Sequence, residues 1–152
     1  MNIEELLVVN HGYVTTKQIQ QFYNCTEKTA RYAIQKAKLK KIARGVYCTP
    51  DKEYDEFYLL QMHYDLIYSH ETSLYLLGLI PKIDKIHATM KNGSRLNERK
   101  RSRYTISYVS KEKYEDGVII AYTKFGNPVR VYNRERTLED IAKHSRRASK
   151  EK

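Results

Sequence analysis

One face of a helix predicted for residues 26–39 carries hydrogen-bonding and cationic side chains. At 100° per residue, the side chains that fall on this face are Lys28, Arg31, Tyr32, Gln35 and Lys36. Arginine reads guanine through two hydrogen bonds, glutamine reads adenine, and tyrosine can touch a thymine methyl group or a phosphate. These residue types at this spacing predict a helix that enters the major groove of DNA.

The same pattern also fits a solvated, charge-rich helix face. Three features favour nucleic acid: Glu27 is the only acidic residue in the segment, the preceding helix and turn have the length of a helix-turn-helix, and a hairpin with Lys40, Lys41 and Arg44 follows at the wing position. The opposite face of the helix is a narrow stripe of small apolar residues that would pack closely on the preceding helix. The stripe consists of Ala30, Ala33, Ile34 and Ala37. The predicted DNA-binding set is polar or basic and comprises Thr16, Lys28, Thr29, Arg31, Tyr32, Gln35, Lys36, Lys40, Lys41 and Arg44.

The elements that must position this helix lie in the first fifty residues. Asn2 can cap a first helix that ends by Gly12, and Thr15 or Thr16 can cap a second helix to about Tyr23. The residues expected inward on the second helix are Ile19, Phe22 and Tyr23. Thr26 caps the third helix, and residues 40–48 alternate around an Arg44-Gly45 turn, as a β-hairpin does. This order predicts a winged helix-turn-helix over residues 1–50, with a basic wing tip against phosphate or the minor groove.

The remaining chain predicts a second, small α/β domain over residues 54–145, so the fold class is α+β. Residues 51–53 form the linker, and residues 146–152 form a basic tail that we expect to fray. Helices are expected over residues 54–64 and 69–77, and a last helix is expected to begin at a cap by Thr137. Strands are expected over residues 83–90, 104–109, 118–122 and 129–132, and a short extended piece is expected over residues 67–69. The strand at 118–122 has the apolar character of a buried strand.

The net charge of +10 is unevenly distributed. Residues 1–50 carry a net +5, residues 51–93 a net −3 and residues 94–152 a net +8. A basic balance favours a polyanionic partner. A possible second basic surface, which fits either phosphate binding or a solvated loop, comprises Arg95, Arg99, Lys100, Arg101 and Arg103. Arg134, Arg136 and Asp140 fit either an ion-pair network or a surface for RNA, DNA or toxin.

No constellation in the sequence indicates catalysis or a metal. His70-Glu71 falls in the first turn of a predicted helix, where the helix dipole favours glutamate. The other histidines lack metal-ligand spacing, and the carboxylates lack a nuclease pattern. We therefore expect no enzyme activity, no metal and no cofactor.

The sequence predicts a cytoplasmic protein that does not contact a membrane. The acidic N-terminus lacks the features of a signal peptide, and the longest apolar runs are too short to cross a bilayer. Cys25 and Cys48 are the only cysteines, and without CxxC spacing they are expected to be free thiols.

Three segments resemble AbiEi-type antitoxins of type IV toxin–antitoxin systems from bacterial abortive-infection loci. They are residues 12–47, which include the hairpin phrase Leu39 to Tyr47, then Ile67 to Leu79, and then Arg136 to Ile141. The resemblance implies that the N-terminal domain binds inverted repeats in its own promoter and represses the operon. It implies that the C-terminal domain opposes a nucleotidyltransferase toxin without a stable complex. Many members continue beyond the point where this sequence ends, so the resemblance predicts repression and leaves antitoxin activity open.

The sequence therefore predicts a sequence-specific DNA-binding repressor that regulates its own toxin–antitoxin operon in phage defence. The partner is double-stranded operator DNA, and a palindromic operator is matched by a homodimer or by two monomers side by side. The alternative is a non-enzymatic module that binds RNA or protein through the same basic face. A nuclease or an accessory of nucleotidyl transfer is the third class considered.

Overall fold

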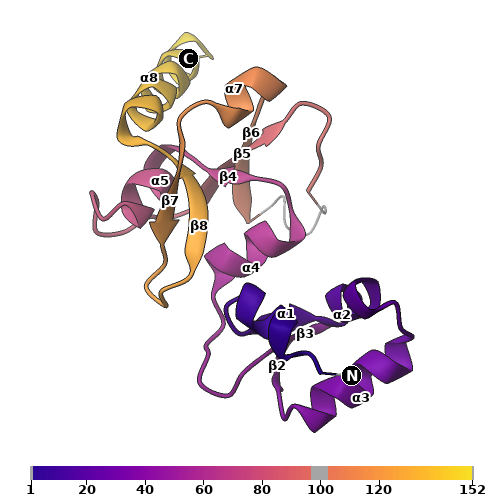
Figure 1. Cartoon of the computed structure of the whole chain (residues 1–152). Helices are drawn as coiled ribbons and strands as arrows, with labels where there is room; N and C mark the ends of the chain where they lie inside the picture. Colours follow the sequence, from indigo (N-terminus) through magenta and orange to yellow (C-terminus); the bar gives the residue numbers. More distant parts are fainter. Residues whose placement is uncertain (1, 97–102, 152) are drawn as a thin grey trace. The chain divides into compact units, whose positions relative to one another are not determined.

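A computed structural model describes residues 2–96 and 103–151 of the chain, with side chains described as far as Arg146 (Figure 1). The chain divides into two compact units, Met1–Tyr54 (unit 1) and Asp55–Lys152 (unit 2). Each unit combines helices with its own β-sheet, which confirms the predicted α+β class. Within the described residues, no helix has both the length and the apolar character required to cross a membrane.

Unit 1 contains three helices and a three-stranded antiparallel sheet. Its elements are α1 (Glu4–Val9), β1 (Tyr13–Thr15), α2 (Thr16–Tyr23), α3 (Glu27–Lys36), β2 (Lys40–Ala43) and β3 (Val46–Cys48). The sheet order is β1-β3-β2, so the predicted hairpin of β2 and β3 is present and β1 extends it. The sequence did not predict β1, because a three-residue strand is defined by its pairing with a distant partner rather than by its own pattern.

Side-chain caps begin the two helices that matter most for the site. Thr15 caps α2: its Oγ1 accepts a hydrogen bond from Gln18 N at 3.0 Å, and Gln18 Oε1 accepts one from Thr15 N at 2.9 Å. Thr26 caps α3, and its Oγ1 accepts a hydrogen bond from Thr29 N at 3.2 Å. Both caps confirm the predicted helix starts. Between the helices, Asn24 has a φ of 50°, the left-handed conformation that often ends a helix.

The core of unit 1 lies between α1, α2, α3 and β1. Its buried residues are Ile3, Leu6, Leu7, Val14, Ile19, Ala30, Ala33 and Ile34. The predicted inward orientation is wrong for two residues. Phe22 is 54% exposed, and Ala37 is exposed because it lies just past the last turn of α3. Tyr23 instead turns toward α1, where its hydroxyl donates to Asn2 O at 2.7 Å, and Phe22 stacks edge-on against Tyr23.

Unit 2 is built on a five-stranded mixed sheet of order β6-β5-β4-β8-β7. Its elements are α4 (Glu56–His63), β4 (Ile67–Tyr68), α5 (His70–Leu76), β5 (Ile86–Lys91), β6 (Tyr104–Val109), α7 (Lys111–Glu115), β7 (Val118–Tyr122), β8 (Pro128–Tyr132) and α8 (Arg134–Glu151). The pairs β5–β6 and β4–β8 are parallel, and the pairs β4–β5 and β7–β8 are antiparallel.

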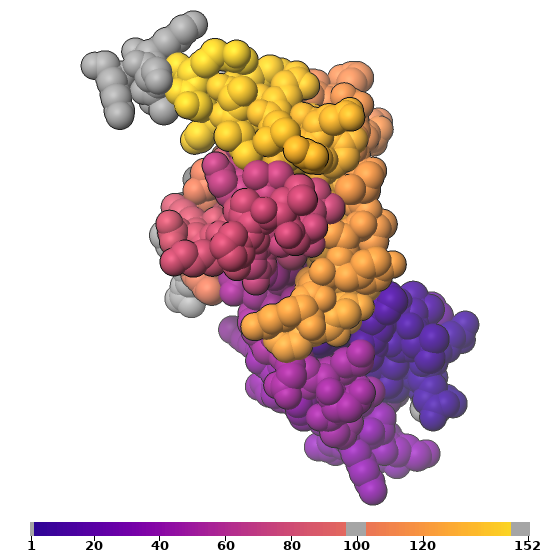
Figure 2. Space-filling view, turned by 90° about the vertical axis from the view of Figure 1, so that its left-hand side faces the viewer, coloured from indigo at the N-terminus to yellow at the C-terminus, as the bar shows by residue number. Residues whose placement is uncertain are grey.

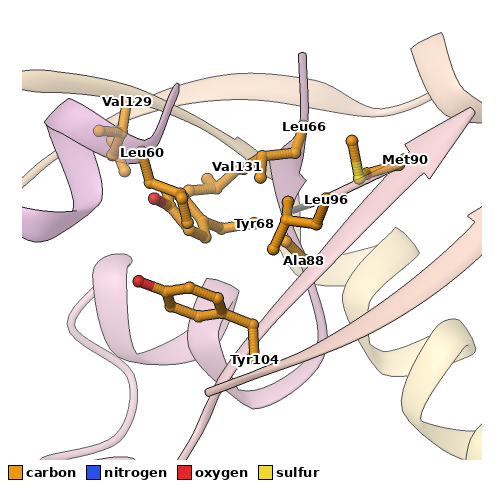
Figure 3. Close-up of a cluster of buried hydrophobic side chains, with 10 residues drawn as sticks. Leu60, Leu66, Tyr68, Ala88, Met90, Leu96, Tyr104, Val129 and Val131 are labelled. Carbon is orange, nitrogen blue, oxygen red and sulfur yellow. The ribbon is translucent and has the colours of Figure 1, made fainter. Parts of the chain in front are cut away.

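Tyr68 on the central strand β4 organises the larger core of unit 2. Its ring is fully buried, with Val129, Val131 and Leu60 around it (Figure 3). Its hydroxyl donates a hydrogen bond to Phe57 O at 2.6 Å, so the buried polar atom is satisfied. Burial raises the pKa of this phenol well above its ordinary value, which keeps it neutral. The core therefore fixes α4 against the sheet.

Three features of unit 2 differ from the sequence prediction. Strand β7 is not a buried strand: it lies at one edge of the sheet, and Ile120 and Tyr122 are 54% and 65% exposed. Helix α8 begins at Arg134 and continues through the expected frayed tail to Glu151. Thr137 is therefore not its cap but lies inside the helix, fully buried. The short helix α7 was not predicted, although Ser110 caps it through a hydrogen bond from Lys113 N.

Candidate nucleic-acid interface

Helix α3 presents the predicted polar face to solvent. Ala30, Ala33 and Ile34 are buried against the rest of unit 1, and this packing turns the opposite face outward. The side chains on the outward face border one shallow groove of about 430 Å³ and are Glu27, Lys28, Arg31, Tyr32 and Gln35. Tyr32 is 66% exposed, far more than a tyrosine usually is in a protein core. The structure therefore brings four of the predicted contact residues together on one open face.

Arg31 is held in this face by an ion pair within the helix. Its Nη2 lies 2.6 Å from Glu27 Oε1, and the two side chains are 67% and 58% exposed. An exposed pair at this spacing is worth about 0.3–0.5 kcal/mol, so exchanging Glu27 for another acceptor costs little. The ion pair therefore orients the guanidinium and leaves it available to another hydrogen-bond acceptor.

The remaining predicted contacts border this face on either side. Thr29 and Lys36 on α3 are exposed, as are Lys41 and Arg44 of the hairpin, whereas Lys40 and Thr16 are half-buried. Thr29 Oγ1 already accepts a hydrogen bond from the capping Thr26 hydroxyl at 3.0 Å. All ten predicted residues belong to unit 1.

A backbone hydrogen bond connects the hairpin turn with the start of α2. Thr16 N donates to Gly45 O at 3.0 Å. Gly45 has a φ of 71°, a conformation that glycine adopts without steric cost. The tip that carries Arg44 is thus fixed beside the first residue of α2.

The possible second basic surface is described only at its ends. Arg99, Lys100 and Arg101 lie outside the described residues. Arg95 is exposed. The Nη2 atom of Arg103 lies 3.3 Å from Glu56 Oε1, and the Arg103 guanidinium lies over the Tyr104 ring, 5.6 Å from the ring centroid. Glu56 therefore balances part of the charge on this predicted surface.

Arg136 and Asp140 form a buried structural network rather than a surface. Arg136 is 5% exposed, and its Nε donates to Asp140 Oδ2 at 2.9 Å. Its Nη1 donates to the carbonyl oxygens of Lys113 and Asp116, and its guanidinium lies 4.1 Å from the Tyr132 ring centroid. One arginine thereby joins α8 to both α7 and β8. Arg134, by contrast, is exposed.

The two C-terminal segments of the family resemblance meet between α5 and α8. Thr137 Oγ1 donates to Ser73 Oγ at 3.1 Å, and Ser73 Oγ donates to Tyr132 O at 2.6 Å. All three residues are fully buried. Figure 2 shows α8, in yellow, directly against the magenta surface of α5. These polar residues hold the unit together, and the sequence did not assign them this role.

A cluster of three histidines was missed by the sequence analysis. The rings of His70 and His87 stack in parallel with centroids 3.6 Å apart, and the His144 ring stands edge-on to both, at 5.5 and 5.6 Å. These residues come from α5, β5 and α8, so no sequence spacing relates them. Among the described residues, no group of histidine, cysteine or acidic side chains has the arrangement of a metal site.

Burial lowers the pKa of the two stacked histidines in this cluster. Desolvation, followed by the neighbouring His70 and His144, lowers the pKa of His87 to about 3. Desolvation also lowers the pKa of His70. At neutral pH both stacked rings are neutral. The hydrogen-bond partners that fix them are Ser69 Oγ, 2.9 Å from His70 Nδ1, and Ser107 Oγ, 2.8 Å from His87 Nε2.

Comparison with known proteins gives a match to a protein family and a similarity to solved structures. Residues 2–50 match the family described as "Transcriptional regulator, AbiEi antitoxin". The crystal structure of the RV2827C protein from Mycobacterium tuberculosis is similar to 65% of this chain, with 13% identity and a TM-score of 0.42. The similar region covers 40% of that protein's chain. No curated protein matches the sequence.

The matched segment contains α1, α2, α3 and the β2–β3 hairpin, which together carry every residue of the exposed polar face. This confirms the resemblance stated from the sequence for its first segment, residues 12–47. Residues 2–50 of this chain are similar to the AbiEi antitoxin family of transcriptional regulators.

Proposed function

We propose that unit 1 is a winged helix-turn-helix that binds operator DNA, with α3 in the major groove. The observation that carries this proposal is the outward face of α3, where Lys28, Arg31, Tyr32 and Gln35 share one groove. Arg31 and Gln35 lie one turn apart and have the chemistry to read guanine and adenine. Lys28 adds positive charge in the first turn of α3.

The hairpin supplies a second contact in this proposal. Arg44 lies at its turn and Lys41 on its first strand, both exposed. In a winged helix these residues meet phosphate oxygens or the minor groove beside the site of the recognition helix. The hydrogen bond between Thr16 N and Gly45 O fixes the spacing of this wing from α2. The wing thus adds affinity, and α3 adds sequence preference.

The biological role that follows is repression of the chain's own toxin–antitoxin operon. The match of residues 2–50 to a family of antitoxin transcriptional regulators supports this role. Unit 2 then acts against a nucleotidyltransferase toxin without forming a stable complex, and two copies of the chain occupy the halves of an inverted repeat. In this scheme, DNA binding and antitoxin activity belong to different units.

The test of DNA binding compares the DNA upstream of the chain's own reading frame with a scrambled fragment of equal length. Binding is measured by fluorescence anisotropy over a salt series. A repressor is expected to prefer the native fragment by more than roughly 10³-fold at physiological salt, with a steep loss of affinity as salt rises. Equal affinity for both fragments would contradict the proposal and favour a basic surface that binds RNA or protein.

A matched pair of variants separates the effect of a positive charge on α3 from the effect of the net charge of the chain. Lys28→Ala removes a charge from the proposed interface, and Lys124→Ala removes one from an exposed turn of unit 2. We expect the first to weaken operator binding and the second to leave it unchanged. An equal effect of both variants would mean that overall charge, and not α3, drives the binding.

The division of labour between the units is tested in cells that express the toxin. A triple variant, Lys28→Ala with Arg31→Ala and Gln35→Ala, is expected to lose repression of a promoter reporter and to keep protection of growth. If protection is lost together with repression, the two activities depend on the same unit, and the proposed division is wrong.

A further inference from the structure

Unit 2 contains a polar cavity that the proposed DNA interface does not use. Its volume is about 470 Å³, and α5, β5, β6, α7 and α8 all contribute to its wall. Ligand pockets for small molecules have volumes of roughly 300–1,000 Å³. Polar side chains of its wall include His70, Ser107, Lys113, Lys143 and His144. Because all of its lining residues lie in unit 2, the cavity is defined without reference to unit 1.

Two lysine amines meet at this cavity. Lys143 is paired with Glu139 at 2.9 Å, whereas no carboxylate within the described residues forms an ion pair with Lys113. Hydrogen bonding with the nearby Lys143 amine lowers the pKa of Lys113, and burial and repulsion by the positive charge of Lys143 lower it further. An anion between the two amines would remove this repulsion and accept a hydrogen bond from each. Phosphate is an oxyanion that lysine commonly binds as a point charge.

The imidazole of His70 lines the same cavity as the two amines. The Nδ1 atom of His70 is engaged by Ser69 Oγ, which leaves Nε2 as the ring nitrogen for a ligand. His70 is buried and has a φ of 55°, in the left-handed region that non-glycine residues rarely adopt. Such strained residues concentrate at functional sites, where the surroundings hold them in place. The wall thus holds a fixed imidazole next to two cations.

The rest of the wall suits an organic group. Ile106, Val109 and the partly exposed Tyr108 provide apolar and aromatic surface. Asp140, the one carboxylate among the described residues of the wall, is already paired with Arg136 at 2.9 Å. Its charge is therefore balanced, and the repulsion it offers to an anion is reduced.

We propose that this cavity binds a small phosphate monoester, with the phosphate between Lys113 and Lys143 and the organic part against Ile106 and Tyr108. The proposal goes beyond operator binding and does not depend on it. The ligand is defined by its chemistry: a dianionic head of phosphate size and a flat or apolar body.

The test is a calorimetric titration of the full chain at low salt with adenosine 5′-monophosphate, adenosine and inorganic phosphate. We expect the monophosphate to bind at least about tenfold more tightly than either part alone, since each part makes only half of the contacts. A 5′-phosphorylated trinucleotide is titrated as a further ligand. If it binds as tightly as the monophosphate or more tightly, the natural ligand is the phosphorylated end of a nucleic acid. If it binds more weakly, the natural ligand is a free nucleotide.

Lys113→Ala and Lys111→Ala form the matched pair, because both lysines lie on the short helix α7 and only Lys113 lines the cavity. We expect Lys113→Ala to weaken the monophosphate about tenfold and Lys111→Ala to change it less than twofold. Lys143→Gln provides a second variant if circular dichroism shows that Lys113→Ala is misfolded. The proposal is overturned if the folded wild type shows no saturable binding up to about 10 mM, or if Lys111→Ala weakens binding as much as Lys113→Ala.

Discussion

In unit 1 the polar residues singled out by their spacing lie at the surface, whereas in unit 2 several polar residues of the two sequence motifs, among them Ser73, Arg136 and Thr137, lie in the interior. Arg31 of unit 1 has an exposed side chain and one ion pair that is easily exchanged. Arg136 of unit 2 is buried and bonded to one carboxylate and two carbonyl groups. The two arginines are alike in chemistry, and their surroundings give them different roles.

The contrast between the exposed Arg31 and the buried Arg136 shows how such motifs should be interpreted. A polar side chain on a helix whose apolar face is satisfied is free to contact a partner. A polar side chain that lies between two helices must satisfy its hydrogen bonds inside the protein, and its loss leaves other groups unpaired. Substitutions in unit 1 should therefore change binding, and substitutions in the unit 2 motifs should change stability.

The largest effect is expected from Arg136→Ala. The variant leaves Asp140 without its partner and the carbonyl groups of Lys113 and Asp116 without a donor. Removing one partner of a buried ion pair costs about 3–5 kcal/mol. Urea unfolding followed by tyrosine fluorescence measures the loss. Arg134→Ala, at an exposed position of the same helix, is the control; an equal loss in both variants would remove the contrast between buried and exposed arginines.

The histidine cluster should make unit 2 less stable in mild acid. His87 is neutral in the folded protein because its pKa is lowered to about 3, while in the unfolded chain it binds a proton below about 6.5. The unfolded state therefore binds more protons between these two values, and stability falls as the pH is lowered from 6.5 toward 3. The loss between pH 7 and pH 5 is about 2 kcal/mol.

Thermal or urea unfolding at several pH values measures this dependence. His87→Gln, which cannot take up a proton, should flatten it. His63→Gln, at an exposed position on α4, should keep the wild-type slope. If His87→Gln keeps the full slope, the dependence comes from other groups and His87 is not its source.

Arg31→Ala and Gln35→Ala should each weaken operator binding by about 1–3 kcal/mol and change binding to scrambled DNA little. Neither variant should alter the stability of unit 1 by more than about 0.5 kcal/mol, because both side chains are exposed. Anisotropy titrations and thermal melts measure the two quantities. Wild-type operator binding by both variants would show that another face of the unit contacts the bases.

The smallest of these effects concerns the cap of α3. Thr26→Ala removes the hydroxyl that accepts a hydrogen bond from Thr29 N and should destabilise unit 1 by about 1 kcal/mol. Thr26→Ser keeps the hydroxyl and should restore most of that stability. Chemical unfolding of the two variants measures the difference, and equal stability of both would mean that the cap is dispensable.

Local signals made much of unit 1 predictable. The caps at Thr15 and Thr26 act within three residues, and the stripe of Ala30, Ala33 and Ile34 defines the buried face of α3. Strand β1 escaped prediction because its partner β3 lies more than thirty residues further along the chain. The predicted inward position of Phe22 was wrong because it is Tyr23, and not Phe22, that contacts the segment of α1.

Unit 2 was less predictable because tertiary contacts define it. The histidine cluster joins three elements that only the fold brings together. Strand β7 has the apolar composition of a buried strand but lies at the sheet edge, and composition alone does not fix strand order. The role of Arg136 was left open between an ion-pair network and a surface, and only its burial against Tyr132 decides between them.

Thr15 has a consequence for the thermodynamics of binding. It is the last residue of β1 and also the cap of α2, so no loop separates the sheet from the helix. A surface built in this way has little freedom to lose, and association then carries a small ordering cost. We expect calorimetry of operator binding to show a heat-capacity change that matches the area of a rigid interface. A much larger value would indicate that folding is coupled to binding.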